Sequence, residues 1–344
     1  QRAGVNVYPV YTVTFSNHTG YGSWRGPMIA ASDVADVIKG IDERGALVGV
    51  DAVLAGYLGS ADMGQVVLEA AALVKSRNPE AIFLADPVMG DVGRGFYARP
   101  GIPEFFRDHV VTAADIMTPN LFELQYLVGH ETGTLSQVVE AARELRERGP
   151  QIVVVTSVVA SDVPDGLLRM LAVDANQAWL VETPMLDRNF TGSGDLTAAM
   201  FLAHWLRTKD LGETLGVTAS VVYSILEQTS ISGEAELQLV AAGEPDQQVH
   251  CTPSRLRPAK LARCITPEGV DLCAELIEAS RKVLVAPVDH VDIPQDGGAA
   301  GREGCQEQTH RGPQRRRALD VTPTPFRRAD DHQFVGVHDG DVRT

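Results

Sequence analysis

Cysteine and long apolar runs are both scarce in this 344-residue sequence. Its four cysteines form no Cys-x-x-Cys pair, which argues against a disulfide framework or a structural zinc site. No apolar run reaches the roughly 18 residues of a membrane span, and the first residues lack the basic-then-apolar pattern of a signal peptide. The sequence therefore predicts a cytoplasmic protein with no membrane partner.

Basic residues are scarce in the first part of the chain. Residues 1–244 hold 16 Lys and Arg against 30 Asp and Glu, whereas residues 245–344 hold 14 against 15. An acidic surface repels polyphosphate, so nucleic acid is excluded as an expected partner. If this part of the chain binds a phosphate compound, backbone dipoles and a metal ion must supply the positive potential.

Segments of strand type alternate with segments of helix type through the first 244 residues. Such alternation, in units of about 30 residues, predicts the α/β class, with a mostly parallel sheet covered by helices on both faces. Two further segments joined by a short turn predict an antiparallel edge. The expected strands are 5–15, 52–57, 81–85, 115–117, 151–156 and the edge pair 167–173 and 177–183; the expected helices are 33–44, 61–77, 121–128, 136–148, 195–206, 211–228 and 234–242.

The composition changes near residue 245. Nine of the 19 prolines fall in residues 245–344, the basic residues there are nearly all Arg, and the alternation stops. These features predict one domain over residues 1–244 and a largely disordered tail over 245–344. Within that tail, one helix is expected over 266–285, with Pro267 in its first turn.

The most informative stretch is Thr191-Gly-Ser-Gly-Asp195, which precedes an apolar run of helical composition. This order places Asp195 in the first turn of a helix. Free N–H groups and the helix dipole favour an anion there, and a carboxylate beside them can accept a proton from a hydroxyl group. The alternative interpretation is an ordinary glycine turn with a capping aspartate.

Polar residues also close the other expected strands, where the carboxyl ends of parallel strands meet at one edge. Each group has a plain structural alternative: a strand-end turn, a capping box or a surface loop. The groups are the turn 16–22 with His18, Tyr57, Asp86-Pro-Val-Met-Gly-Asp91, the glycine-bearing loop 91–101 with Arg94, Thr118-Pro-Asn-Leu-Phe-Glu123 and Thr156-Ser157.

Taken in order, these motifs resemble the pyridoxal kinase family of the ribokinase-like superfamily, over about residues 1–243. Phe15-Ser-Asn-His-Thr-Gly-Tyr21 is the most discriminating motif, because related sugar and hydroxymethylpyrimidine kinases share the Asn-x-x-Glu and Gly-x-Gly-Asp elements but not this one. The resemblance implies a three-layer αβα ribokinase-like fold. It also implies a homodimer that transfers a phosphoryl group from ATP to the 5′-hydroxymethyl group of pyridoxal, with Mg²⁺ and a monovalent cation as cofactors.

The resemblance assigns a role to each motif. Asp195 becomes the catalytic base that contacts pyridoxal, and Gly192, Ser193 and Gly194 form the anion hole. Phe15, Thr19 and Tyr57 form the pocket for the pyridine ring. The metal falls to Asp86, Thr118 and Glu123, and the nucleotide to Asp86, Asp91, Tyr97, Asn120, Glu123, Thr156 and Ser157.

Three features depart from the family pattern. The usual Gly-Thr-Gly-Asp is Gly-Ser-Gly-Asp here, the tail matches nothing in the family, and family members begin with an additional strand, polar loop and helix, of which only residues 1–4 are present. An inner strand lost from a parallel sheet would expose two edges. Two alternatives stay open: a kinase for a hydroxymethylpyrimidine, and a non-catalytic vitamin B6-binding protein.

Overall fold

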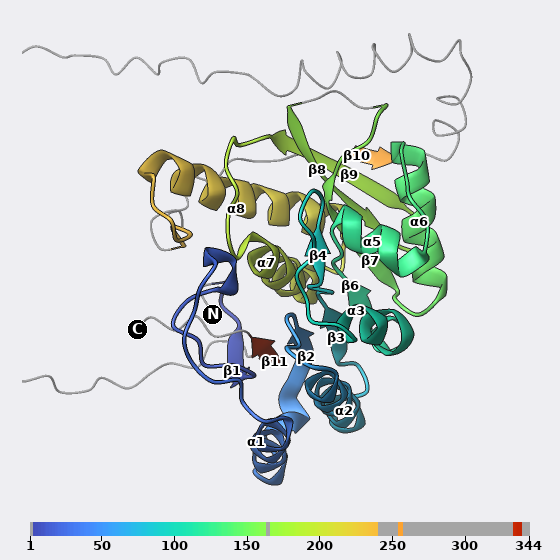
Figure 1. The fold of residues 1–344 in the computed structure, drawn as a ribbon. Coiled ribbons are helices and arrows are strands. Elements are labelled where there is room, and N and C mark those ends of the chain that lie inside the picture. Colours follow the sequence, from blue (N-terminus) through green and yellow to red (C-terminus); the bar gives the residue numbers. More distant parts are fainter. Residues whose placement is uncertain (1–2, 163–165, 240–253, 257–332, 339–344) are drawn as a thin grey trace, which may run out of the picture. The chain divides into compact units, whose positions relative to one another are not determined.

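The computed structural model describes residues 3–162, 166–239, 254–256 and 333–338, which form a main sheet of nine strands (Figure 1). Neighbouring strands are parallel from β1 to β7 and antiparallel from β7 to β10. The predicted α/β class, with a mostly parallel sheet and an antiparallel edge, is confirmed. In spatial order the strands are β1 (Asn6–Tyr11), β11 (Gln333–His338), β2 (Val50–Ala55), β3 (Ile82–Ala85), β6 (Ile116–Met117), β7 (Ile152–Val158), β8 (Leu167–Val173), β9 (Ala178–Pro184) and β10 (Ser254–Leu256).

Helices cover both faces of this sheet and complete three layers (Figure 1). One apolar cluster joins the sheet to the helices that follow β1 to β6, and a second joins it to the last two helices. The first layer holds α1 (Ala31–Glu43), α2 (Ala61–Arg77), α3 (Ile102–Phe105), α5 (Leu121–Val128) and α6 (Leu135–Glu147); the second holds α7 (Ser193–Thr208) and α8 (Leu211–Ser232). Short helical turns, η1 (Thr19–Tyr21), η2 (Ala46–Gly49), η3 (Phe106–Val110) and α4 (Val111–Ala113), complete the set.

Burial on both faces explains why the inner strands are mostly apolar. In β7, Val153 and Val155 belong to the first cluster, whereas Ile152 and Val154 belong to the second. Successive side chains of a strand point to opposite faces, so each face receives two of them. Each such side chain stabilises the fold by about 1.5–3 kcal/mol relative to an exposed one.

Two strands of the main sheet come from the range in which a separate tail is expected. β10 pairs with β9, and β11 lies between β1 and β2, parallel to both. Val335 stands opposite Tyr8 on one side and Val53 on the other. The range 245–344, expected to be a separate tail, therefore contributes two strands to the sheet of the first domain. The expected helix over 266–285 lies outside the described residues.

Several expected boundaries are wrong. β1 ends at Tyr11 instead of residue 15, and β2 ends at Ala55 instead of residue 57. β7 continues to Val158 instead of ending at residue 156, with a register shift against β8 between Val155 and Val158. No helix covers residues 234–239, the described part of the helix expected over 234–242, because α8 extends to Ser232 and ends at a left-handed Gly233. Tertiary contacts described below hold this segment as a turn.

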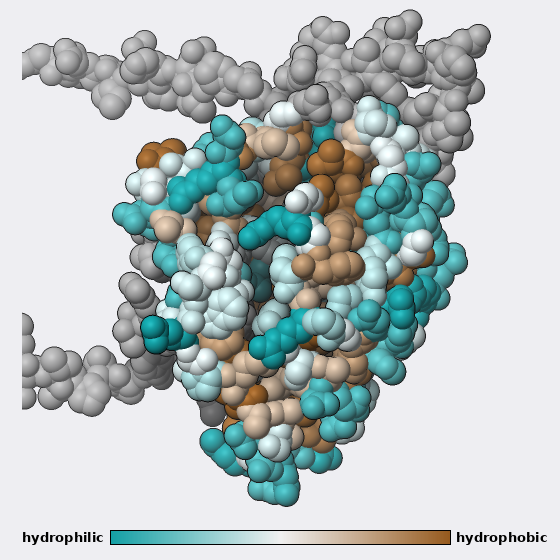
Figure 2. All heavy atoms as spheres, in the orientation of Figure 1, coloured by the Kyte–Doolittle hydropathy of each residue, from teal (hydrophilic) through white to brown (hydrophobic). Residues whose placement is uncertain are grey.

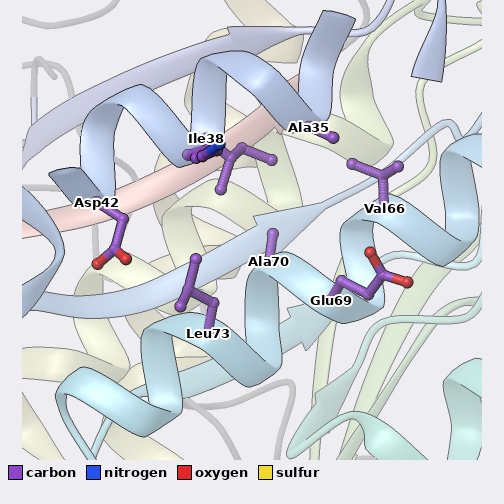
Figure 3. A pocket seen from close by; sticks show the side chains of 8 residues that line it. Ala35, Ile38, Asp42, Val66, Glu69, Ala70 and Leu73 are labelled. Carbon is purple, nitrogen blue, oxygen red and sulfur yellow. The ribbon is translucent and has the colours of Figure 1, made fainter. Parts of the chain in front are cut away.

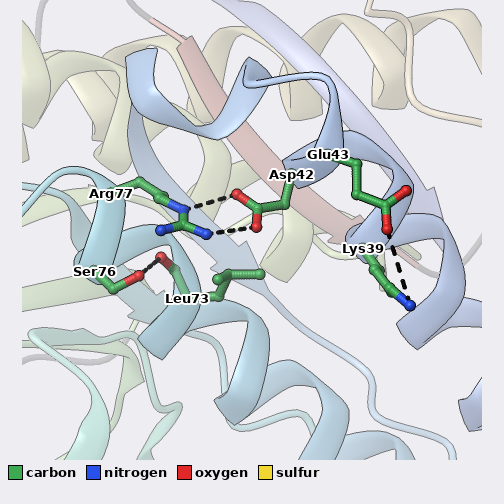
Figure 4. A network of polar contacts seen from close by, with 6 residues as sticks. All are labelled: Lys39, Asp42, Glu43, Leu73, Ser76 and Arg77. Atoms are coloured by element: carbon green, nitrogen blue, oxygen red, sulfur yellow. Dashed lines mark hydrogen bonds and ion pairs between the residues drawn. The ribbon is translucent and has the colours of Figure 1, made fainter.

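α1 and α2 pack side by side and enclose a hollow of about 140 Å³ between their middle turns (Figure 3). Ile38, Val66 and Leu73 are among its apolar lining residues, and Lys39, Asp42 and Glu69 also line it. Next to it, the Arg77 guanidinium donates to both carboxylate oxygens of Asp42, at 2.9 and 2.8 Å (Figure 4). This pairing joins the two helices.

No helix in the described ranges is long and apolar enough to cross a membrane. On the face shown in Figure 2, hydrophilic residues surround separate apolar patches. This face is hollowed between the loop that follows β1 and the hairpin of β4 (Gly90–Asp91) and β5 (Gly95–Phe96). The polar residues that close the strands lie at this edge.

Candidate active site

The loop before α7 presents backbone N–H groups to this edge of the sheet. We call residues 190–194 the anion loop. Gly192 is the N-cap of α7 at φ 82°, a left-handed conformation that glycine adopts without strain. The Ser193 hydroxyl donates to the Phe190 carbonyl at 3.0 Å and braces the turn. The first N–H groups of a helix have no intrahelical acceptor, so this loop can receive an anion.

Asp195 occupies the first turn of α7, as predicted, and its carboxylate lies close to the carboxyl ends of two strands. A Cβ placed on Gly56, directly after β2, would lie 3.5 Å from Asp195 Oδ1. A Cβ placed on Gly194 would lie 3.8 Å from Oδ2 of Asp86, which follows β3. The two glycines keep the space around the two carboxylates open for a ligand.

Asp86 is a buried carboxyl group with no ion-pair partner among the described residues. Its Oδ1 accepts a hydrogen bond from the Thr118 hydroxyl at 2.9 Å. Burial, and then repulsion by Asp195, raises the pKa of Asp86 to about 7, although the bond from Thr118 opposes the shift. Near neutral pH this carboxyl group therefore exists in both its protonated and its ionised form.

Glu123 is a second buried carboxyl group. It is the N3 residue of the capping box of α5, in which Asn120 is the N-cap. Oε1 accepts from the Met89 and Gly90 N–H groups at 3.0 and 3.4 Å, and Oε2 accepts from the Asn120 N–H at 2.9 Å. Burial and repulsion by Asp86 still raise the pKa of Glu123 well above its usual value. The capping box predicted from the sequence is confirmed, and this carboxylate also fixes the turn after Asp86.

The β4–β5 hairpin occupies the loop expected over 91–101. A Cβ on Gly90 would lie only 2.3 Å from Phe122, so only glycine allows the hairpin to dock so closely on α5. The Asn120 side-chain amide donates to the Gly90 carbonyl at 2.8 Å, and the Phe96 ring lies edge-on to Phe122 with centroids 5.0 Å apart. The hairpin is thereby fixed to the helix that carries Glu123.

Tyr97 follows this hairpin, and its ring is half exposed. Burial of its hydroxyl group raises its pKa, and repulsion from Glu123, Asp86, Asp91 and Asp195 raises it further. Tyr97 therefore lies within electrostatic reach of all four carboxyl groups named in the sequence analysis. Asp91 itself lies in β4 and accepts from the Val92 N–H at 2.7 Å.

Thr156 and Ser157 lie inside β7, at its register shift, and not after the strand as expected. The Thr156 N–H donates to the Pro119 carbonyl at 2.9 Å, and Asn120 and Thr156 form a parallel bridge. Ser157 has φ 52°, which strains a residue with a side chain. These contacts place both hydroxyl-bearing residues beside the start of α5.

Residues 12–29 form a projecting flap. Its two arms pair through the bonds Thr14 N–H to Pro27 O at 2.9 Å and Ser16 N–H to Arg25 O at 2.7 Å. The Phe15 ring packs on Trp24 with centroids 5.8 Å apart. His18 Nδ1 accepts from the Gly20 N–H at 2.9 Å, so His18 caps the turn η1. Here the interpretation of His18 as a turn residue is the one the geometry supports.

The flap meets both neighbouring loops. A Cβ on Gly20, next to Thr19, would lie 3.5 Å from Thr191 Oγ1. A Cβ on Gly59 would lie 2.9 Å from Met28 of the flap and 3.7 Å from the Tyr57 ring. Thr19 is thus near the anion loop, and Tyr57 is near the flap. The pocket that Phe15, Thr19 and Tyr57 are expected to form stays a prediction.

Two parts of the site were missed from the sequence. Phe122 docks the hairpin, and Arg188 reaches from the loop before α7 to the end of α8. Phe122 lies inside the motif of residues 118–123 but was given no role there, and Arg188 belongs to none of the motifs. The described residues contain no group of three His, Cys, Asp or Glu side chains that could hold a metal ion.

Comparison with known proteins decides the family. The profile of the phosphomethylpyrimidine kinase family matches residues 12–238. Pyridoxal kinase PdxY of Rubrobacter xylanophilus is 52% identical over 245 residues, which cover 71% of this chain and 84% of that relative. The chain belongs to the pyridoxal kinase family.

Solved structures show the same fold. Pyridoxal kinase of Leishmania donovani, in complex with ADP and pyridoxine, is 26% identical with a TM-score of 0.64, over 71% of this chain and 87% of that one. A Bacteroides thetaiotaomicron protein described as a putative phosphomethylpyrimidine kinase, in a crystal form with pyridoxal, is 27% identical with a TM-score of 0.64, over 74% of this chain and 91% of that one. Both likenesses confirm the expected ribokinase-like αβα fold.

Proposed function

We propose that the chain is an ATP-dependent pyridoxal kinase that phosphorylates the 5′-hydroxymethyl group of pyridoxal. The observation that carries this proposal is Asp195 in the first turn of α7, behind a glycine loop and next to buried Asp86. The hydroxyl group that accepts the phosphoryl group needs a base to take its proton. The phosphoryl group itself needs N–H groups or cations that stabilise the negative charge on its oxygens. This edge of the sheet offers both within one turn of helix.

In this proposal Asp195 accepts the proton of the substrate hydroxyl group as the hydroxyl oxygen attacks the γ-phosphorus of ATP. The bond between that phosphorus and the β,γ-bridging oxygen breaks, and ADP leaves. The N–H groups of the anion loop, Gly192, Ser193 and Gly194, receive the charge that spreads over the phosphoryl oxygens. The β4–β5 hairpin and the flap exclude water from opposite sides of the hollow. Asp91, Tyr97, Asn120, Thr156 and Ser157 would contact the nucleotide.

The acidic residues at this edge fit Mg²⁺. In the described part of the chain, neither Asp86 nor Glu123 has a basic partner, although both are buried. Mg²⁺ is usually held by one or two carboxylates together with phosphate oxygens and water, which agrees with a site of few protein ligands. Asp86 and Glu123 would hold it, with the Thr118 hydroxyl orienting Asp86. The ion would neutralise phosphate charge, and a monovalent cation could add to that effect.

Phe15, Thr19 and Tyr57 would orient the flat pyridine ring from the flap and the β2 edge. Aromatic rings that stack on or stand edge-on to a ligand ring contribute about 0.5–1.5 kcal/mol beyond burial. The family further suggests a homodimer, and dependence on ATP suggests the cytoplasm as its place of action.

The rival kinase for hydroxymethylpyrimidine draws support from the name of the matching family profile. The crystal form of the Bacteroides protein with pyridoxal weakens that support, because a protein described by the pyrimidine name was solved with the pyridine compound. The flap motif also favours pyridoxal. A binding protein without catalysis would retain the ring pocket and have no use for Asp195.

One assay separates these three functions. The full chain is given Mg²⁺ and ATP with pyridoxal or with hydroxymethylpyrimidine, and ADP formation is measured. We expect pyridoxal to be preferred, and Asp195→Asn to lower kcat by about 10²–10⁴-fold with little change in nucleotide affinity. Ser193→Ala is the matched change in the same helical turn and should cost far less. Preference for the pyrimidine, or no turnover with either compound, would overturn the proposal.

A further inference from the structure

Arg188 joins two segments at the edge of the candidate site that the kinase motifs do not connect. It precedes the anion loop, and its guanidinium lies over the Phe190 ring at 5.4 Å from the centroid. Nη1 donates to the Thr229 carbonyl at 3.1 Å, and Nη2 donates to the Glu234 carbonyl. A planar guanidinium holds several acceptors in fixed directions, which a flexible ammonium group cannot do.

Thr229 is a rigid anchor for this contact. It is fully buried in the last turns of α8. Its hydroxyl donates to the Ile225 carbonyl at 2.6 Å and accepts from the Gln238 N–H at 2.9 Å. The chain after α8 is therefore folded back on the helix end. This fold-back is the reason that the helix expected over 234–242 does not form in its described part.

We call residues 233–239 the α8 tail. It lies next to the anion loop, because a Cβ placed on Gly192 would lie 3.7 Å from Leu237 Cδ1. It also contacts the flap, because the Tyr21 hydroxyl donates to the Ala235 carbonyl at 3.3 Å. One short segment thus lies beside the loop that would receive phosphate and is hydrogen-bonded to the flap that would receive the ring. Figure 1 shows the end of α8 on the same side of the molecule as the start of α7 and the loop after β1.

We propose that Arg188 is a positioning residue, which holds the anion loop in its working conformation by fixing it to Thr229 and to the α8 tail. The proposal rests on the kinase function proposed above. Both guanidinium hydrogen bonds go to backbone carbonyls, so Arg188 can act by holding the loop in place. Displacing reacting groups by about 1 Å can lower a rate 10²-fold, which gives this contact a measurable effect.

Arg148 offers a matched control. Its guanidinium also donates to two backbone carbonyls, those of Leu127 and Arg107 (2.8 Å for the second), but at the end of α6. Both Arg188→Ala and Arg148→Ala remove two such bonds and should lower the thermal midpoint. Only Arg188→Ala should lower kcat, by about tenfold to a hundredfold, with a smaller change in the KM for pyridoxal.

Guanidinium chloride at low, non-denaturing concentration tests the same idea chemically. It should restore part of the lost kcat of Arg188→Ala and leave Arg148→Ala unchanged. Arg188→Lys keeps the positive charge but lacks the planar guanidinium group, so this variant should fold and have a reduced kcat. If Arg188→Ala does not fold, Arg188→Lys is measured in its place. An unchanged kcat in a folded Arg188 variant, or an equal loss in Arg148→Ala, would refute the positioning role. Lack of turnover in the unmodified chain would instead refute the kinase function.

Discussion

Asp86→Asn should make the protein more stable above neutral pH while it removes the proposed metal ligand. Burial and the neighbouring Asp195 raise the pKa of Asp86 from 3.8 to about 7. Between these values the folded protein keeps a proton that the unfolded chain has lost. Stability therefore falls as the pH rises through this window, by about 1.4 kcal/mol per pH unit and roughly 4 kcal/mol in total.

An asparagine at this position carries no charge at any pH, and its side-chain oxygen can still accept from the Thr118 hydroxyl. The variant should gain about 10 °C in thermal midpoint at pH 8, and much less at pH 4.5, where the unmodified Asp86 is protonated in the folded state. Thermal unfolding followed by circular dichroism, with EDTA present to remove divalent cations, measures both values. Pyridoxal kinase activity should be lost in the same variant.

Asp42→Asn is the control of opposite sign. The Arg77 hydrogen bond lowers the pKa of Asp42, so the ionised carboxylate stabilises the protein above the unfolded pKa and the variant should be less stable at pH 8. The reasoning on Asp86 is refuted if Asp86→Asn gains nothing at pH 8, or gains equally at both pH values. Either result would show that the charge of Asp86 is compensated in the folded protein.

Two further changes test the ring pocket and the inserted strand. Tyr57→Ala should raise the KM for pyridoxal about tenfold or more and leave the KM for ATP nearly unchanged, because it removes ring contact only; a parallel rise in both would contradict the pocket. Val335→Pro removes a donor in the middle of β11 and should lower the thermal midpoint by about 5 °C or more, whereas Val342→Pro, outside the described strand, serves as its control. An unchanged midpoint in Val335→Pro would favour a dispensable tail.

Local sequence patterns predicted most of the strands and helices in residues 1–239, because each of these elements has its own run or periodic pattern of apolar residues. The limits of β8 at residues 167 and 173 were predicted without error. β11 could not be predicted in this way. Its position between β1 and β2 depends on pairing with strands that lie hundreds of residues earlier, and its own glycine, Gly336, is unfavourable for a strand.

The candidate site shows the same division. The position of Asp195 and the capping box of Glu123 follow from short-range spacing, and both were predicted. The α8 tail was predicted as a helix because its residues suit one, but contacts with Arg188 and Tyr21, 46 and 214 residues away, hold it as a turn. Helical propensity amounts to tenths of a kcal/mol per residue, whereas such tertiary contacts contribute about 1 kcal/mol or more each.

The raised pKa values of Asp86 and Glu123 come from burial and from neighbouring carboxyl groups. Asp86 and Glu123 are buried together, and the described salt bridges leave both without a basic partner. A lysine or arginine between them would lower their pKa values and stabilise the protein, but it would also occupy the space that a cation and a phosphate need. The two buried carboxyl groups therefore lower the stability of the protein without a ligand, and the proposed cation would neutralise them when it binds. Its stability and its proposed activity make opposite demands on the same two carboxyl groups.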